Sequence, residues 1–253
     1  MPHTFLTGAS SGIGRSLARR IARDEPITLV ARRAELLESL AQEIAADGGQ
    51  ATCPVPCDVT DRDAVRAAVA TAEARLGPIT RLVANAGGGE ATTVEDFSSQ
   101  HVRAVVDLNL MGTVYCIEAV LPGMLERREG HLVAMSSIAG YRGLPGGAAY
   151  SASKAALTNL MESLRIDLRP RGVDVTVLAP GFVRTKLANK AKRKRHKPLR
   201  MDLEPATELM LRAIQARKPF YAFPTSMRVL VGLGRMLPGS LYDRMLAGRG
   251  PGK

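Results

Sequence analysis

Tryptophan is absent from the 253 residues, and aromatic residues make up only 4% of the chain. The core must therefore be mostly aliphatic. No window reaches the ~18 uninterrupted apolar residues of a membrane span, and the first residues do not have the charged and apolar regions of a secretory signal. Three cysteines are an odd number, which favours reduced thiols, and no Cys/His cluster supplies the four ligands of a zinc site. We expect a cytoplasmic protein without a bound metal.

The remaining composition is ordinary for a soluble globular protein, with 45% hydrophobic and 23% charged residues. The length suits one large domain with a full core, and no internal repeat or linker divides the chain. We therefore expect a single domain over residues 1–253.

The net charge of +11 comes from one segment. Nine Lys and Arg residues and no acidic residue lie between Arg184 and Arg200, and removing these nine charges from +11 leaves +2 for the rest. The basic excess thus belongs to this segment and not to the whole surface.

Short apolar stretches alternate with segments of helical periodicity. Strands are expected at residues 4–7, 27–31, 51–55, 79–84, 131–135, 173–178 and 220–223. Helices are expected from residue 13 to about 24 and at residues 34–47, 61–76, 101–121, 150–169 and 205–216, whereas residues 227–246 are less regular. This alternation implies an α/β fold, in which a doubly wound parallel sheet of about seven strands carries helices on both faces. Ligands bind such a sheet outside the carboxyl ends of its strands.

A glycine-rich turn, TGASSGIG at residues 7–14, joins the first expected strand to the first helix. Glycines allow a close approach of backbone N–H groups to a pyrophosphate, and the helix N-terminus adds a partial positive charge. The placement between strand and helix favours a dinucleotide-binding turn over an ordinary loop. The turn resembles the TGxxxGxG cofactor loop of the short-chain dehydrogenase/reductases, and the resemblance extends over residues 4–187. It implies one Rossmann-type domain that binds a nicotinamide dinucleotide.

Further segments carry the same resemblance. Residues 85–87 are similar to the family's N-A-G motif near the adenosine ribose, although Ala84 stands where the family usually has Asn. Asp58 is similar to the family's adenine-binding acid, with a helix-entry role as the alternative, and residues 180–185 match P-G-x-x-x-T, whose Thr contacts the nicotinamide carboxamide. The resemblance implies cofactor contacts at Gly8, Ser10, Ser11, Gly12, Ile13, Gly14, Asp58, Val59, Asn85, Ala86, Gly87, Tyr150, Lys154, Pro180, Gly181, Val183 and Thr185.

The residues after the second expected strand bear on the choice of cofactor. An NAD site places an acidic residue there for the ribose 2′-hydroxyl, but this chain has Arg32 and Arg33, with no acid before Glu35. Arg15, directly after the glycine turn, is a second candidate for binding a phosphate. Guanidinium groups suit phosphate geometry, so NADP(H) is favoured over NAD(H). The alternative is that Arg32 and Arg33 are solvated surface cations.

A Tyr–Lys pair is the candidate reacting centre. Tyr150 and Lys154 are four residues apart and share one face of the expected helix, so an ammonium lies beside a phenol. A phenol normally titrates near pH ~10, and a neighbouring cation lowers that pKa. The pair matches the family's Y-x-x-x-K motif. Ser137 lies at the family's usual distance before Tyr150, with Ser136 as the alternative, and Asn109 matches the family's N-x-x-G.

The resemblance implies a role for each of these residues. Tyr150 is the general acid in reduction and the base in oxidation. Lys154 lowers the pKa of Tyr150 and binds the nicotinamide ribose, Ser137 donates to the substrate oxygen, and Asn109 holds a water that links Lys154 to solvent. The expected function is the reversible, NADP(H)-dependent reduction of a ketone or aldehyde carbonyl, with 3-oxoacyl and other apolar carbonyl compounds as candidate substrates.

Two other functions stay open. One is a Rossmann domain that binds NADP(H) as a redox sensor or scaffold without turnover, and the other is a dehydratase or isomerase on the same fold. The family resemblance also implies a homodimer or homotetramer, assembled through the helices at residues 101–121 and 150–169.

Residues 184–204 fall where the family places its substrate loop and lid. Three interpretations of the basic run at 184–200 compete: a solvated loop, a cationic mouth for an acidic acyl carrier, and attraction to an anionic membrane surface. The last is helped by the apolar and cationic tail at residues 225–253 and would make the protein peripherally membrane-associated. Nucleic-acid binding is not expected, because no aromatic residues interleave with these charges.

Overall fold

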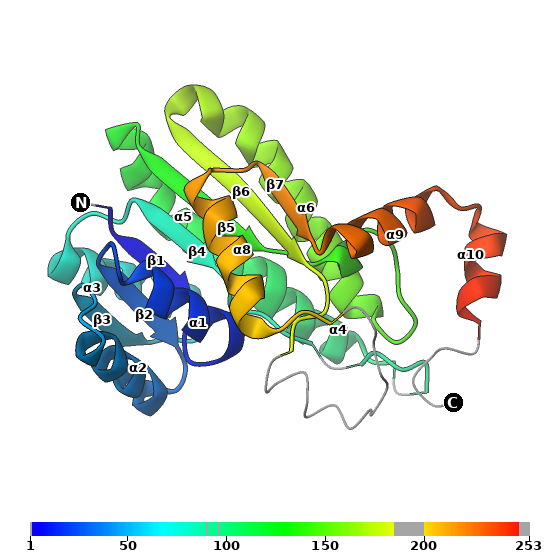
Figure 1. Ribbon diagram of the computed structural model, residues 1–253, viewed down its shortest axis with the longest axis horizontal. Coiled ribbons are helices and arrows are strands. Elements are labelled where there is room, and N and C mark those ends of the chain that lie inside the picture. Colours follow the sequence, from blue (N-terminus) through cyan, green and yellow to red (C-terminus); the bar gives the residue numbers. More distant parts are fainter. Residues whose placement is uncertain (1, 90, 96, 185–199, 248–253) are drawn as a thin grey trace.

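The computed structural model describes residues 2–89, 91–95, 97–184 and 200–247 (Figure 1). At its centre is a seven-stranded sheet in the order β3-β2-β1-β4-β5-β6-β7, and each neighbouring pair is parallel. The strands are β1 (Thr4–Thr7), β2 (Ile27–Ala31), β3 (Thr52–Pro56), β4 (Arg81–Ala84), β5 (Gly130–Met135), β6 (Val173–Pro180) and β7 (Phe220–Phe223). The strand order reverses between β1 and β4, so the sheet is doubly wound, and the predicted fold class is confirmed.

Helices alternate with these strands along the chain. They are α1 (Gly12–Ile21), α2 (Ala34–Ala46), α3 (Arg62–Leu76), α4 (Ser99–Val106), α5 (Gly112–Arg127), α6 (Ala148–Leu168), α8 (Leu203–Gln215), α9 (Thr225–Met236) and α10 (Gly239–Leu246). Three single turns are η1 (Asp107–Met111), η2 (Ile138–Gly140) and η3 (Arg169–Arg171). The carboxylate of Asp61 accepts from the N–H groups of Asp63 and Ala64 at 3.0 Å, and so caps α3.

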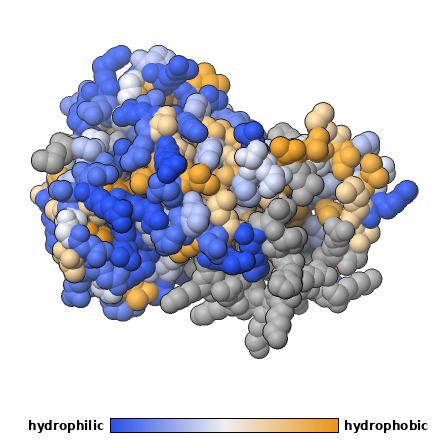
Figure 2. Space-filling model, viewed as in Figure 1, coloured by the Kyte–Doolittle hydropathy of each residue, from blue (hydrophilic) through white to orange (hydrophobic). Residues whose placement is uncertain are grey.

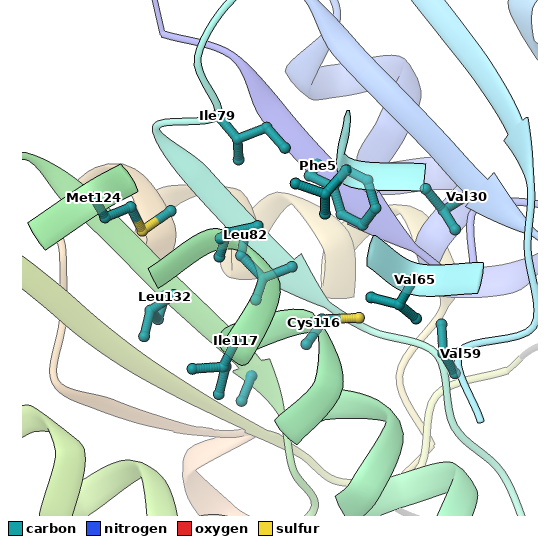
Figure 3. Packing of buried hydrophobic residues seen from close by; sticks show 14 of the residues in the cluster. Phe5, Val30, Val59, Val65, Ile79, Leu82, Cys116, Ile117, Met124 and Leu132 are labelled. Carbon is teal, nitrogen blue, oxygen red and sulfur yellow. The ribbon is translucent and has the colours of Figure 1, made fainter. Parts of the chain in front are cut away.

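The sheet separates two aliphatic layers, because successive strand residues point to opposite faces. Phe5, Leu82 and Leu132 belong to the layer covered by α3, α5 and α6, part of which Figure 3 shows. Leu6 and Val83 belong to the layer covered by α1, α2 and α8. Both faces of the sheet are therefore buried, which explains why its central strands carry apolar residues on both faces.

Strand β3 is the edge strand beyond β2, and it contains Pro54 and Pro56. Proline has no N–H to donate within a sheet, so it is tolerated at an edge and not in a central strand. All strands lie within two residues of their predicted bounds.

The predicted helix at residues 101–121 differs from the structure. The chain is helical from Ser99 to Arg127, but a wide π-turn, η1, separates α4 from α5 at the position of Asn109. By length and composition this run could cross a membrane, but in the fold it packs against α3, α6 and β4. Such turns are frequent at functional sites, and no apolar periodicity announces them.

The tail is more regular than the sequence indicates. Residues 225–246 form α9 and α10, which project from the body of the protein beyond β7 (Figure 1). Pro224 and Pro238 stand immediately before the two helices, where a missing N–H and a fixed φ are tolerated.

Candidate active site

The predicted motifs meet at one edge of the sheet, because each follows the carboxyl end of a parallel strand. The glycine turn follows β1, residues 85–87 follow β4, residues 136–137 follow β5, and Pro180 ends β6. These four strands are consecutive neighbours in the sheet. Segments that are far apart in sequence therefore share one site, at the edge where open α/β sheets bind their ligands.

The glycine turn leaves backbone donors for an anion. Gly8 and Gly12 have φ angles of +69° and +55°, in the left-handed region that glycine adopts without strain. Ser11 is the N-cap of α1, but its side chain makes no capping hydrogen bond, and the first turn of α1 carries no acidic residue. The first N–H groups of the helix are thus left for a phosphate, and the turn fits the diphosphate of a dinucleotide.

Asn85 fastens the loop after β4 to the glycine turn. Its side-chain amide donates to the Thr7 carbonyl at 3.0 Å, and its backbone N–H and that of Ala86 both donate to Thr7 Oγ1 at 3.0 Å. A Cβ atom on Gly14 would lie 2.2 Å from the Gly8 carbonyl oxygen and 2.6 Å from the Asn85 amide nitrogen. No side chain fits at Gly14, so the turn and the loop hold each other in place.

Of the arginines predicted to bind a phosphate, Arg15 and Arg33 differ in the contacts that they make within the protein. Arg15 is bound by the Glu43 carboxylate at 2.6 Å and donates to the Leu36 carbonyl at 3.1 Å. Arg33 donates to Ser10 Oγ at 3.0 Å, which places its guanidinium beside the glycine turn. Arg33 is therefore the arginine that contacts the predicted diphosphate site directly, while Arg15 braces α1 against α2.

Arg32 is more loosely held. Its side chain is 77% exposed and lies 3.7 Å from the Asp58 carboxylate, which also accepts from the N–H and hydroxyl of Thr60. An exposed ion pair at this distance contributes little to stability, so Arg32 can turn to another anion.

Val59, the residue after Asp58, is buried and packs on Gly112, where a Cβ atom would lie 2.8 Å from Val59 Cγ2.

Asn109 lies in η1 and is fully buried. Its Oδ1 accepts from the Gly88 N–H at 2.9 Å, and its Nδ2 donates to the Gly88 carbonyl at 2.7 Å and to Ser153 Oγ at 3.1 Å. The Ser153 hydroxyl in turn donates to the Tyr150 carbonyl at 2.8 Å. Asn109 thereby ties η1 to the loop after β4 and to α6. Within the described residues its Oδ1 accepts from Gly88 alone, which leaves one lone pair for a further donor.

Lys154 is buried on α6, and its Nζ donates to the Met135 carbonyl at 2.7 Å. A Cβ atom on Gly87 would lie 2.7 Å from Asn109 Oδ1 and 3.2 Å from Lys154 Nζ, so the backbone of Gly87 passes closely by both groups. Burial lowers the pKa of Lys154 to about 8. This amine can therefore gain and lose a proton near neutral pH.

Tyr150 is partly buried, and its ring lies against Gly89, where a Cβ atom would be 3.2 Å from Cδ2. Burial raises the pKa of Tyr150 above its ordinary value, and the neighbouring Ser137 hydroxyl opposes this increase. The expectation that Lys154 lowers this pKa differs from the structure. Lys154 Nζ donates to the Met135 carbonyl and lies 5.8 Å from the centroid of the Tyr150 ring, and burial is the largest influence on this pKa.

The two serines after β5 have different surroundings. The Ser136 hydroxyl is buried, donates to the Lys154 carbonyl at 3.0 Å and lies 2.7 Å from Thr158 Oγ1, so it holds β5 against α6. Ser137 is the N-cap of η2, where its side chain accepts from the Ala139 N–H at 3.2 Å, and its hydroxyl lies close enough to the Tyr150 phenol to influence its pKa. Ser137 is therefore the serine that lies at the phenol, as the spacing in the sequence indicates.

The segment after β6 is described in part. The Ser137 hydroxyl donates weakly to the Pro180 carbonyl at 3.5 Å, and the Gly181 N–H donates to the last residue of β7 at 2.7 Å. Val183 pairs with Met201 across the two ends of the basic segment. Thr185 and the rest of residues 185–199 lie outside the described residues.

The described part of the chain contains no group of three or more His, Cys, Asp or Glu residues that could hold a metal ion. Cys53, Cys57 and Cys116 are buried and unpaired. Burial raises the pKa of Cys116 to about 12, so this thiol keeps its proton.

Comparison with known proteins agrees with this geometry. A sequence model of the family described as short chain dehydrogenase matches residues 2–196. The chain is also 42% identical over 240 residues to a protein of Myxococcus xanthus (strain DK1622) described as an uncharacterized oxidoreductase, and the match covers 94% of each chain. The chain belongs to the short-chain dehydrogenase family. It is an oxidoreductase of that family.

Solved structures of similar fold include complexes with both cofactors. A short-chain dehydrogenase from Sphingobium yanoikuyae in complex with NADPH has a TM-score of 0.81 and 26% identity, with 95% of this chain and 98% of that chain covered. A 3-oxoacyl-[acyl-carrier protein] reductase with bound NAD from Brucella melitensis has a TM-score of 0.76 and 30% identity, with 87% of each chain covered. The short-chain dehydrogenase described here thus has the family's NAD(P)-binding fold.

Sequence reasoning missed two polar residues of this site. Thr7 holds the loop after β4 through its hydroxyl, and Ser153 joins Asn109 to Tyr150. A signal exists for each: Thr7 stands first in the glycine turn, and Ser153 lies three residues after Tyr150, on the same face of α6.

Proposed function

We propose that this short-chain dehydrogenase uses NADP(H) to reduce the carbonyl of an apolar ketone or aldehyde, and that it catalyses the reverse oxidation. The observation that carries the proposal is that the Ser137 hydroxyl lies close enough to the Tyr150 phenol to influence its pKa, at the sheet edge where the dinucleotide turn also lies. Two hydroxyl groups side by side can both donate to one carbonyl oxygen. A protein that only bound a cofactor would gain nothing from that pairing.

The ionisation of Tyr150 suits reduction. Because burial raises the pKa of the phenol, Tyr150 carries its proton at neutral pH and can donate it to the oxygen of the substrate. Ser137 stabilises the negative charge that develops on the same oxygen. The dinucleotide supplies the hydride when bound, and the protein orients it.

Lys154 and Asn109 are suited to returning the proton. The amine of Lys154, with a pKa of about 8, exchanges protons at the pH of the reaction. Asn109 lies next to it across Gly87 and has a free lone pair for a water. A chain from Tyr150 through Lys154 to solvent water would therefore restore the phenol after each turnover.

The preference for NADP(H) rests on the end of β2. Arg32 is exposed and loosely paired, and Arg33 lies beside the glycine turn. No acidic residue that would repel a 2′-phosphate lies between the end of β2 and Glu35. The test is Arg33→Ala and Arg32→Ala, alone and together, with Arg15→Ala as the control. KM for NADPH should rise about tenfold or more in the double variant while KM for NADH changes little. An equal change in both values would refute the preference.

The chemistry is tested with Tyr150→Phe. Turnover should fall by about three orders of magnitude, while NADPH binding, followed by the fluorescence of the cofactor, stays within about twofold. The assay is NADPH oxidation over a panel of ketones, aldehydes and 3-oxoacyl thioesters, which also identifies the substrate class. Turnover unchanged in Tyr150→Phe would exclude the mechanism, and NADPH binding without oxidation of any panel member would favour a sensor or scaffold.

A further inference from the structure

Helix α9 is apolar on two opposite sides. Its inner side carries Met227 and Val231, which pack with Ile138 of η2 and with β7. Val229, Leu233 and Met236 are 51%, 60% and 82% exposed and recur every three to four residues, so they form one outward stripe. Two residues of helix turn the direction by about 200°, which sets Val229 opposite Met227.

Helix α10 continues the outward surface. Leu241 and Met245 are four residues apart, and they are 43% and 53% exposed. Tyr242 and Leu246 instead face the loop after η2, where they line a shallow cavity together with Gly143 and Pro145. Figure 2 shows apolar side chains along this projecting part of the molecule, whereas the body is mostly hydrophilic on the same view. We call the outward residues Val229, Leu233, Met236, Leu241 and Met245 the tail surface.

The tail surface cannot turn inward without breaking specific contacts. The Arg142 guanidinium donates to the carbonyls of Gly234 and Leu237 and stacks on the Tyr242 ring at 3.8 Å from its centroid. The Tyr242 hydroxyl donates to the Gly143 carbonyl at 2.7 Å. These contacts fix both helices to the loop between Ser137 and Tyr150, so the apolar stripe is held outward.

The charges around the tail surface are mainly positive. Arg228 and Arg244 are exposed on α9 and α10, with Asp243 as the acidic residue of these helices. The residues on either side of the basic run at 184–200, Val183 and Met201, pair with each other after the end of β6. Strand β7, which α9 follows, lies beside β6. In sequence this run carries nine Lys and Arg and no acid. An apolar stripe flanked by cations is the pattern of helices that lie in the surface of an anionic bilayer.

We propose that the tail surface docks on an anionic phospholipid bilayer, a property that goes beyond the catalytic function proposed above. The alternative occupant is a second copy of this chain. A two-fold contact through α9 and α10 would bring the same cations of both copies together, whereas lipid phosphates neutralise them. Because α9 packs on η2, directly after Ser137, docking would place the reacting centre close to substrates dissolved in the membrane.

The experiment measures sedimentation of the full chain with vesicles, without cofactor or substrate, so its outcome is independent of turnover. The probes are vesicles of phosphatidylcholine alone and of an equimolar mixture of phosphatidylcholine and phosphatidylglycerol. The protein should pellet with the anionic vesicles, and the bound fraction should fall as salt is added. The triple variant Val229→Ser/Leu233→Ser/Met236→Ser should lower the partition coefficient by about tenfold or more.

Two controls separate docking from loss of the fold. Leu233→Met/Met236→Leu keeps the stripe apolar and should bind like the unchanged protein, and Ile166→Ser removes an apolar side chain that is 70% exposed on α6 and should also bind. Met236→Ser alone, at the most exposed position, should give a smaller loss than the triple variant.

The proposal fails if the unchanged protein does not pellet with anionic vesicles, or if the triple variant pellets as well as the unchanged protein. Light scattering on the same samples identifies the alternative. An oligomer that becomes smaller in the triple variant, without vesicle binding by the unchanged protein, would assign the tail surface to contacts between copies.

Discussion

The close packing of the Gly87 backbone against the side chains of Asn109 and Lys154 can be tested with alanine substitutions at two neighbouring glycines. A Cβ atom at Gly87 would lie 2.7 Å from Asn109 Oδ1 and 3.2 Å from Lys154 Nζ, whereas a Cβ atom at Gly88 meets nothing within 4 Å. Ordinary contacts need about 3.5 Å. Gly87→Ala must therefore displace the Asn109 amide or the loop by several tenths of an ångström, while Gly88→Ala needs no displacement.

Neither neighbour can give way freely. The Asn109 amide is bound to both backbone groups of Gly88 and to Ser153, and Lys154 is bound to the Met135 carbonyl. Overpacking in such a site typically costs about 1–3 kcal/mol. We expect Gly87→Ala to lose about that much free energy of unfolding, and Gly88→Ala to stay within about 1 kcal/mol of the unchanged protein.

The assay is urea unfolding of both variants without cofactor, so that only contacts within the protein are compared. Turnover should also fall by about tenfold in Gly87→Ala, because a misplacement of about 1 Å of groups next to the phenol costs about a hundredfold and a displacement of several tenths of an ångström costs less. Equal losses of unfolding free energy in the two variants would refute the close packing of Gly87 against these side chains.

Three further predictions concern residues around the site and at the opposite end of the sheet. Thr7→Val removes the acceptor for two partly buried N–H groups, including that of Asn85, and should cost about 1–3 kcal/mol in urea unfolding, a loss that Thr7→Ser should largely avoid. Burial lowers the pKa of His131 from 6.5 to about 3, so unfolding takes up a proton between these two pH values. The free energy of unfolding should therefore fall as the pH falls from 6.5 towards 3, by up to about 1.4 kcal/mol per pH unit. A His131→Gln variant whose free energy of unfolding depends on pH in the same way would contradict this. Arg142→Met should release α9 and α10, raising proteolysis near Leu237 with little change in the unfolding of the sheet, and unaltered cleavage would argue against the Arg142 contacts.

The sequence by itself determined the architecture and the main motifs of the site. Both are written in local patterns: apolar stretches of strand length alternating with helices, a glycine turn between a strand and a helix, and Tyr150 and Lys154 one helical turn apart. The arrangement at the sheet edge follows from topology, because parallel strands bring their carboxyl ends together. These features depend on neighbours within a few residues, which a sequence displays directly.

Only the tertiary structure decided the electrostatics and the side-chain partners. The pKa of Tyr150 is raised by desolvation, and the amine of Lys154 donates to the Met135 carbonyl of another element. The π-turn that turns Asn109 inward, and the contacts of Arg142 that keep α9 and α10 outward, likewise join segments distant in sequence. Burial and long-range hydrogen bonds depend on which elements pack together, and a single chain carries no local pattern from which they can be read.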